Sequence, residues 1–294
     1  MRAALAIALA LGLTGLGCAA DNDAASTQRG SVAAGSLHAL LQRGGEDVGL
    51  SMGTSDHGPG RVRVSFLVIT RNGRAIERPT ARVWLARALE ARPFQRVTAR
   101  LERVGARERI YVANLDVREP GRYWLLAEPV GGTPVQGVGN VEVKEETASP
   151  AIGSEAFPSR TPTLADASPE QLTTRKPPDT ELLRVSVADA LERDEPFVLA
   201  FATPKYCASR ACGPVVDVVD DVRTTFAGSG VRFIHVEIYE ENNPALGTNR
   251  WVREWKLPTE PWVFLVGRDG RIKAKFEGAL SADELAAAVR RFLA

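Results

Sequence analysis

The chain has 294 residues, of which 44% are hydrophobic and 25% are charged. This composition is typical of a globular protein with room for two ordinary domains. The formal net charge is only +1, and no run of Lys and Arg with interleaved aromatic residues stands out. The sequence therefore argues against nucleic-acid binding.

Residues 1–17 begin with an arginine after the initiator methionine and continue as an apolar segment, which is typical of a secretory leader and too short for a membrane span. Gly17 directly before Cys18 resembles the lipobox of bacterial lipoproteins, in which the cysteine is lipidated and becomes the mature N-terminus. Gly15 stands where that pattern prefers Leu, so an ordinary cleaved signal peptide is the alternative. The resemblance implies a tether over residues 18–35 and a protein that is lipid-anchored to a bacterial membrane, facing the periplasm or the cell exterior. That environment permits disulfides.

Residues 36–146 contain short segments of alternating apolar and polar residues separated by glycine-rich turns. This spacing predicts an all-β sandwich of about seven strands. The segments that show the alternation best are Arg61 to Thr70, Ala81 to Ala86, Arg109 to Asp116, Tyr123 to Ala127 and Gly137 to Val143. In the first of them, the apolar side chains at 62, 64, 66 and 68 share one face and should line the core. The region resembles immunoglobulin-like domains of bacterial extracytoplasmic proteins, a resemblance that implies no site residues.

Residues 147–180 carry six prolines among Ser, Thr, Ala and Asp, which predicts a partly extended, Pro-rich linker. Over residues 181–294 the pattern changes to strands alternating with helices, which indicates an α/β domain. Strands are expected at Phe197 to Phe201, Val231 to Glu237, Trp262 to Val266 and Ile272 to Phe276, and helices are expected to begin after Ser186 and Ser281.

Cys207 and Cys212 form a C-x-x-x-x-C pair between an apolar strand, residues 197–201, and a helix-like run of valines. This is the strand–turn–helix setting of a dithiol redox site. The positive end of the helix dipole favours thiolate over thiol, and Lys205 and Arg210 add positive charge nearby. We therefore expect one cysteine of the pair to have a lowered pKa and to react as the thiolate.

The order and spacing of these elements lead to a family. Residues 182–294 resemble the thioredoxin-like fold, with Cys207 and Cys212 at the start of the active-site helix and Pro261 at the position of its cis-proline. Pro261 stands nine residues before Gly270, the separation found in thioredoxins and in the membrane-tethered thiol-disulfide oxidoreductases of the periplasm.

The resemblance implies a fold and an activity. The cis bond would bring the backbone of Thr259 and Glu260 alongside the reactive sulfur, where the family pairs this backbone with the substrate peptide. Cys207 would attack a substrate disulfide and Cys212 would resolve the mixed disulfide. Expected partners are the thiols and disulfides of extracytoplasmic proteins and a membrane electron donor, and no cofactor is implied.

Three departures from the family pattern bear on the chemistry. Two additional residues separate the cysteines, Tyr206 replaces the Trp before the first cysteine, and the strand Val198 to Ala202 lacks the buried acid of thioredoxin. Glu260 stands where a hydrophobic or hydroxyl residue is common. Its carboxylate would either oppose thiolate formation or serve as a proton acceptor.

Two alternatives to a cycling dithiol remain open. The pair is a structural disulfide in an interaction protein, or it binds Cu(I), as in thioredoxin-fold copper-delivery proteins that use two cysteines and a histidine. His235 is the one histidine in this part of the chain, and its place in a strand favours an interior role. Similarly, Trp251, Trp255 and Trp262 are expected in the core more than in a substrate groove.

Overall fold

The computed structural model describes residues 33–43, 45–207 and 212–294. The leader, the lipidation site Cys18 and most of the expected tether lie outside the described residues, so these remain predictions. The remainder of the chain belongs to one compact unit, Val32–Ala294. Among the helices of the described ranges, none is both long and apolar enough to cross a bilayer.

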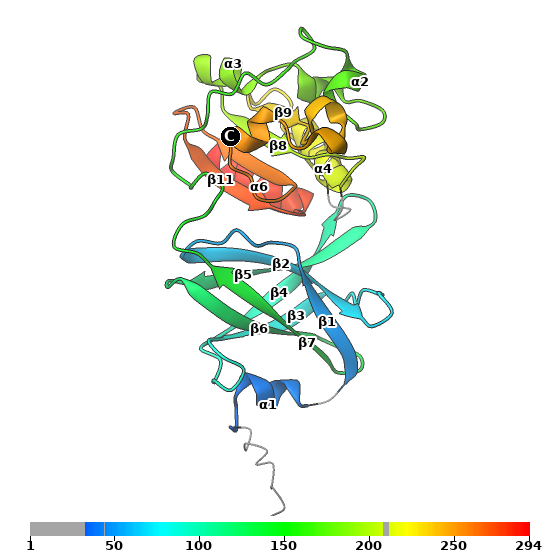
Figure 1. Cartoon of the computed structure of the whole chain (residues 1–294), viewed down its shortest axis with the longest axis vertical. Coiled ribbons are helices and arrows are strands. Elements are labelled where there is room, and N and C mark those ends of the chain that lie inside the picture. Colours follow the sequence, from blue (N-terminus) through cyan, green and yellow to red (C-terminus); the bar gives the residue numbers. More distant parts are fainter. Residues whose placement is uncertain (1–32, 44, 208–211) are drawn as a thin grey trace, which may run out of the picture. The chain divides into compact units, whose positions relative to one another are not determined.

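The N-terminal half forms a β-barrel (Figure 1). Its elements are α1 (Leu37–Leu41), β1 (Glu46–Met52), β2 (Gly60–Thr70), β3 (Thr80–Ala86), β4 (Gln95–Val104), β5 (Glu108–Val117), β6 (Gly121–Pro129) and β7 (Val135–Val143). The strands close in the order β1-β2-β5-β4-β3-β6-β7. Closure depends on β1, which pairs antiparallel with β2 and, through Glu46 and Asp47, parallel with β7.

The predicted immunoglobulin-like sandwich is therefore corrected to a closed barrel. Strand β3 pairs with both β4 and β6, so the described strands do not separate into two sheets. Alternation along each strand gives an inward and an outward face in either architecture, which is why the sequence pattern did not distinguish them. The predicted inward face is confirmed: Val62, Val64, Phe66 and Val68 are all at most 3% exposed.

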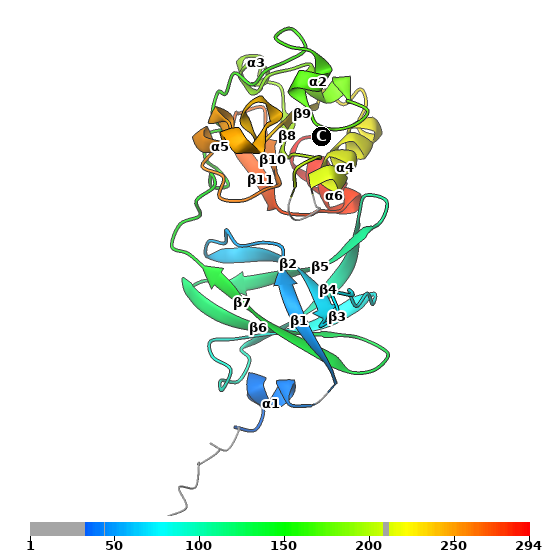
Figure 2. The same ribbon diagram turned by 45° about the vertical axis from the view of Figure 1, so that its right-hand side comes forward.

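The C-terminal half contains a four-stranded sheet in the order β11-β10-β8-β9. Its elements are α2 (Pro169–Leu172), η1 (Thr180–Leu183), α3 (Val187–Glu192), β8 (Phe197–Phe201), α4 (Cys212–Thr225), β9 (Arg232–Val236), η2 (Glu240–Asn242), η3 (Pro244–Leu246), α5 (Arg250–Glu254), β10 (Trp262–Val266), β11 (Ile272–Glu277) and α6 (Ala282–Phe292). β8 and β9 are parallel, whereas β10 is antiparallel to both of its neighbours. Helices α4 and α6 pack on one face of this sheet and α3 and α5 on the other (Figure 2).

Local sequence signals account for the ends of these elements. The Oγ atoms of Ser186 and Ser281 accept hydrogen bonds from the backbone N–H groups three residues later, which caps α3 and α6 where the sequence predicted. Gly270 adopts a φ of 68° in the turn between β10 and β11, a conformation that favours glycine. The four predicted strands of this region are confirmed to within one residue at each end.

The predicted linker is part of the packed structure. Gly153 N–H donates to the carbonyl of Ile272, and Ala156 N–H donates to that of Gly270, so this segment extends along the β10–β11 turn. Farther along, the side chain of Ser159 accepts a hydrogen bond of 2.9 Å from Trp255 Nε1 in the core. Parts of the segment are extended, as its proline content predicted, but it also contains helix α2, and tertiary contacts anchor it.

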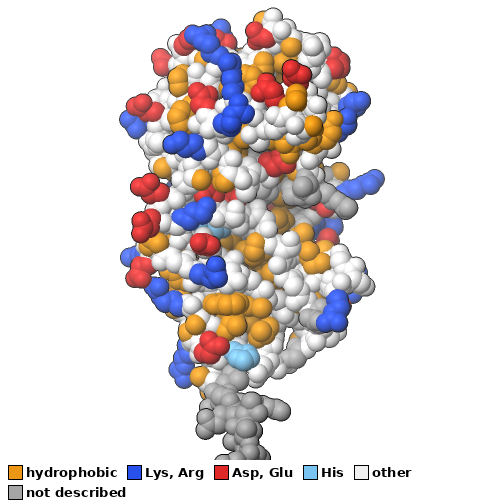
Figure 3. Space-filling model, viewed as in Figure 1, with side chains coloured by type: hydrophobic (Ala, Val, Ile, Leu, Met, Phe, Trp, Pro, Cys, Tyr) orange, Lys and Arg blue, Asp and Glu red, His pale blue; other side chains and the backbone are white. Residues whose placement is uncertain are grey.

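Acidic and basic side chains are interspersed on the face of the molecule shown in Figure 3. Many of them form ion pairs, such as Arg82 with Glu128 and Arg232 with Glu195. The surface charges thus balance locally as well as in the net charge of the sequence.

Candidate functional site

Cys207 lies six residues beyond the end of β8, at the close of a turn. All five residues of β8 are buried, which fixes the strand at the centre of the sheet. The Cys207 side chain is half-buried and packs against the hydrophobic core that α4 covers. Helix α4 begins at Cys212, as the sequence predicted, although the position of the Cys212 side chain and residues 208–211 lie outside the description.

Strand pairing brings Pro261 to the same end of the sheet as Cys207. β8 and β10 run antiparallel, with Phe201 at the end of β8 opposite Trp262 at the start of β10. The chain that leaves β8 toward Cys207 and the chain that enters β10 through Pro261 therefore lie at one end of the sheet. The Glu260–Pro261 peptide bond is cis, as the resemblance implied.

Glu260 is the carboxylate of this site. It is half-buried, and its buried Oε2 has no hydrogen-bond partner among the described residues. Burial and, to a smaller extent, the negative charges of Cys207 and Glu237 raise the pKa of Glu260 from its usual 4.5 to about 7. The electrostatic effect of Cys207 requires the carboxyl to lie near the sulfur. At neutral pH Glu260 thus exists in both protonation states.

A second buried carboxyl, Glu237, was missed at the sequence level. It follows β9, is 5% exposed, and its Oε1 accepts hydrogen bonds from the backbone N–H and Oγ1 of Thr174 at 2.5 and 2.7 Å. Its Oε2 is buried without a hydrogen-bond partner among the described residues. The only sequence signal is an acidic residue at the end of the predicted strand Val231 to Glu237, next to Ile238.

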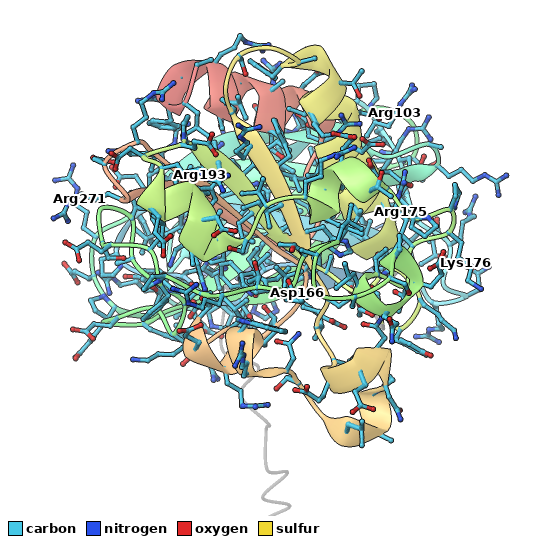
Figure 4. All side chains as sticks on the ribbon, turned by 90° about the horizontal axis from the view of Figure 1, so that it is seen from above. Arg103, Asp166, Arg175, Lys176, Arg193 and Arg271 are labelled. Carbon is cyan, nitrogen blue, oxygen red and sulfur yellow. The ribbon has the colours of Figure 1, made fainter. Side chains whose placement is uncertain are left out.

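The segment predicted as a linker supplies the residues around Glu237. Thr174 Oγ1 also accepts a hydrogen bond of 3.1 Å from Lys205 N–H, in the turn before Cys207. The next residue, Arg175, binds Asp217 of α4 through a 3.0 Å hydrogen bond, and it lies beside Lys176 in Figure 4. This segment therefore connects the turn before Cys207 with helix α4.

His235 occupies an interior position. It is 4% exposed, and its Nε2 lies 3.0 Å from the carbonyl oxygen of Ala202. Burial lowers the pKa of this imidazole, and the nearby Glu237 opposes the effect. A neutral ring that donates to a backbone carbonyl agrees with the interior interpretation more than with that of a metal ligand.

Lys205 and Tyr206 lie at the exposed side of the site. Lys205 Nζ is 4.8 Å from the centre of the Tyr206 ring, and this ring packs edge-on against Tyr239 at 6.4 Å. The pair holds a positive charge in the turn before Cys207.

The predicted core position is confirmed for two of the three tryptophans, Trp255 and Trp262. Trp255 and Trp262 are 0% and 1% exposed, and both rings contact Phe264. Trp251 is half-buried, and its Nε1 donates to the carbonyl of Arg160. These rings support the sheet behind the site.

Glu277 anchors the segment before Pro261. At the end of β11, its buried carboxylate accepts hydrogen bonds from Thr259 Oγ1 at 2.7 Å, from the Ser55 N–H and Oγ at 2.7 and 2.9 Å, and from the Asp56 N–H at 2.8 Å. The barrel loop and the segment before Pro261 therefore share one acceptor. The contacts of Glu277 with Ser55 and Asp56 join residues more than 200 positions apart, so local sequence patterns gave no signal for them.

Comparison with known proteins adds a distant likeness. No family model matches the chain, and no curated protein matches it significantly. Among solved structures, StoA from Bacillus subtilis is similar at 16% identity over 33% of this chain and 83% of its own, with a TM-score of 0.24. A thioredoxin-family thiol:disulfide interchange protein from Chlorobium tepidum TLS is similar at 14% identity over 50% and 97%, with a TM-score of 0.29. Because these scores are low, the assignment of the site depends on the sheet order, the helix start and the cis-proline.

Proposed function

We propose that the protein is a thiol-disulfide oxidoreductase with Cys207 and Cys212 as its redox pair. The observation that carries this proposal is the pairing of Phe201 with Trp262. This pairing brings the turn that ends at Cys207 and the cis peptide bond before Pro261 to one end of the sheet. Helix α4 begins at Cys212, so its dipole favours a thiolate at this end of the sheet.

The exchange proceeds in two steps. The Cys207 thiolate attacks one sulfur of a substrate disulfide, which forms a mixed disulfide and releases the other substrate sulfur as a thiolate. Cys212, as thiolate, then attacks the Cys207 sulfur, closes the Cys207–Cys212 disulfide and releases the second substrate thiolate. Two electrons pass from the pair to the substrate, and the released thiolates take up two protons. The reverse sequence oxidises a substrate dithiol.

Glu260 moves a proton in this scheme. With a pKa of about 7, its carboxyl can accept the proton of a thiol and return one to a leaving thiolate at neutral pH. In its ionised form it opposes the neighbouring Cys207 thiolate. The protonation state of Glu260 therefore sets how readily Cys207 reacts.

The substrates in this proposal are disulfide-containing proteins outside the cytoplasm. The apolar leader and Cys18 support export and attachment to a bacterial membrane through lipid. A membrane dithiol donor would return electrons to the oxidised pair. The barrel would then hold the site at the membrane surface.

A trapping experiment tests the redox pair. Cys212→Ala removes the resolving thiol, so purified variant mixed with insulin should accumulate an adduct that dithiothreitol releases. The matched double variant Cys207→Ala/Cys212→Ala should form none. Absence of the adduct in the single variant would contradict the proposal. So would a pair in the wild-type protein that stays oxidised below about −300 mV, as structural disulfides do.

A further inference from the structure

A cleft of about 560 Å³ borders the segment before Pro261. Thr259 and Glu260 form one side of it, together with the residues that follow β11. The barrel forms the other side through residues 51–55, which span the end of β1 and the start of the following loop, and through residues of β2, β4 and β5. The apolar lining residues are Met52, Leu67, Val104, Ile110 and Ala279, and the charged ones are Glu108, Arg109, Glu260 and Glu277.

The barrel wall of this cleft is built by strand alternation. Along β2 the side chains of Phe66 and Val68 point into the barrel core, so Leu67 between them faces outward. Leu67 is half-buried because it packs against Val104 and Ile110, which form a small apolar cluster with Ala279. This cluster gives the cleft an apolar wall.

Glu277 fixes the distance between the two walls. Its carboxylate accepts from Ser55 on the barrel side and from Thr259 on the other, and at 8% exposed it is shielded from water. At Gly278, the carbonyl oxygen of Gly53 would lie 2.3 Å from an added Cβ, so the two backbones are in direct contact there. These contacts therefore hold the two walls of the cleft in fixed positions.

The cleft is continuous with the proposed redox site. Strand β10 begins at Trp262, so the backbone of Thr259 and Glu260 lies outside the sheet pairing of the described strands. Glu260 lines the cleft, and the charge of Cys207 acts on its carboxyl. A polypeptide bound along the cleft would thus extend from the barrel to the reactive sulfur.

We propose that this cleft binds the polypeptide that flanks the reactive cysteine of a protein substrate, with an apolar side chain of the substrate against the barrel wall. This inference rests on the proposed function and names its substrate class. The volume lies within the range of about 300–1,000 Å³ that is typical of ligand sites. Three acidic residues, Glu108, Glu260 and Glu277, line the cleft against one basic residue, Arg109, which pairs with Glu77. Charge repulsion therefore disfavours an acidic flank, and apolar flanks are selected.

Two synthetic peptides of equal length test the proposal. Each carries one cysteine as a mixed disulfide with thionitrobenzoate, flanked in one peptide by leucine and valine and in the other by glutamate and serine. Attack by Cys207 releases the coloured thiolate, so the rate is read directly. We expect kcat/KM for the apolar peptide to exceed that for the acidic one by about 10-fold, the range of a hydrophobic contact.

Matched substitutions on strand β2 test whether the cleft wall causes the preference for the apolar peptide. Leu67→Glu places a charge on the cleft wall and should reduce the preference for the apolar peptide by about 10-fold, mainly through KM. Ile69→Glu is the control, since Ile69 is also outward-facing and half-buried on β2 but does not line the cleft. Leu67→Thr is a milder second variant should the glutamate prevent folding.

The outcomes separate the inference from the function on which it rests. Hydroxyethyl disulfide is small enough to reach the sulfur without filling the cleft. If the wild-type protein reduces it but treats the two peptides alike, or if the Leu67 variants keep the wild-type preference, the substrate cleft is refuted and the redox activity stands. If the wild-type protein reacts with neither hydroxyethyl disulfide nor peptide, the proposed function itself fails.

Discussion

Glu260→Gln removes the ionisable group whose pKa the site changes most clearly. The glutamine keeps the shape of the side chain but cannot ionise. The wild-type carboxyl has a pKa of about 7 in the folded protein against a usual 4.5. At about 1.4 kcal/mol for each pH unit, this difference corresponds to at most about 3.5 kcal/mol of stability. Because the side chain is only half-buried, solvent screening reduces the expected effect to about 2 kcal/mol.

The sign follows from proton binding. The folded protein binds the Glu260 proton more tightly than the unfolded chain, so this contribution is fully present below about pH 4.5 and is lost as the pH rises through about 7. The free energy of unfolding of the wild-type protein should therefore fall from pH 5 to pH 8 relative to that of the variant. Other titrating groups occur in both proteins and cancel in the difference.

Urea unfolding of the reduced proteins at half-unit pH steps measures this difference. Glu170→Gln, at an exposed position of α2, is the matched control and should follow the wild-type curve. Iodoacetamide alkylation gives an independent readout, because removing the negative charge near Cys207 should move the midpoint of its reactivity to lower pH. Parallel stability curves for the wild-type protein and Glu260→Gln would refute the argument.

The other predictions concern the contacts that hold the site in place. Glu277→Gln should destabilise the protein by about 1.5–3 kcal/mol and raise KM for the apolar peptide. The control Glu284→Gln breaks the 2.8 Å ion pair with Arg63 but does not touch the segment before Pro261, so it should affect stability alone. Urea unfolding measures the stability of both variants, and peptide kinetics measure their KM. For Asp56, burial raises the pKa, but hydrogen bonds from Ser149, from the backbone and from a lysine lower it below its usual value. Its stabilisation is therefore present above that value and is lost as the pH falls, so Asp56→Asn should be about 2 kcal/mol less stable at pH 7, with a gap that closes toward pH 3 in urea unfolding. Trp255→Ala should cost about 3–5 kcal/mol by thermal or urea unfolding, since the ring is fully buried; a loss below 1 kcal/mol would contradict the packing.

The sequence by itself determined the local elements and the placement of the cysteine pair. Alternation located the inward face of β2, apolar runs located β8 and β10, and serine caps located the starts of α3 and α6. The resemblance to the thioredoxin-like fold implied the cis bond before Pro261, and the valine repeat predicted a helix that begins within a residue or two of Cys212. These features depend on neighbouring residues, so a short stretch of chain carries enough information to predict them.

Only the tertiary structure decided how these elements meet. The closure of the barrel through β1, the packing of residues 147–180, and the shared acceptor Glu277 all join parts of the chain that are distant in sequence. The same holds for Glu237, whose partner Thr174 belongs to a segment that composition predicted as a linker. Composition and periodicity report how each residue relates to its own element, whereas the pKa of a carboxyl depends on burial and on charges brought by other elements.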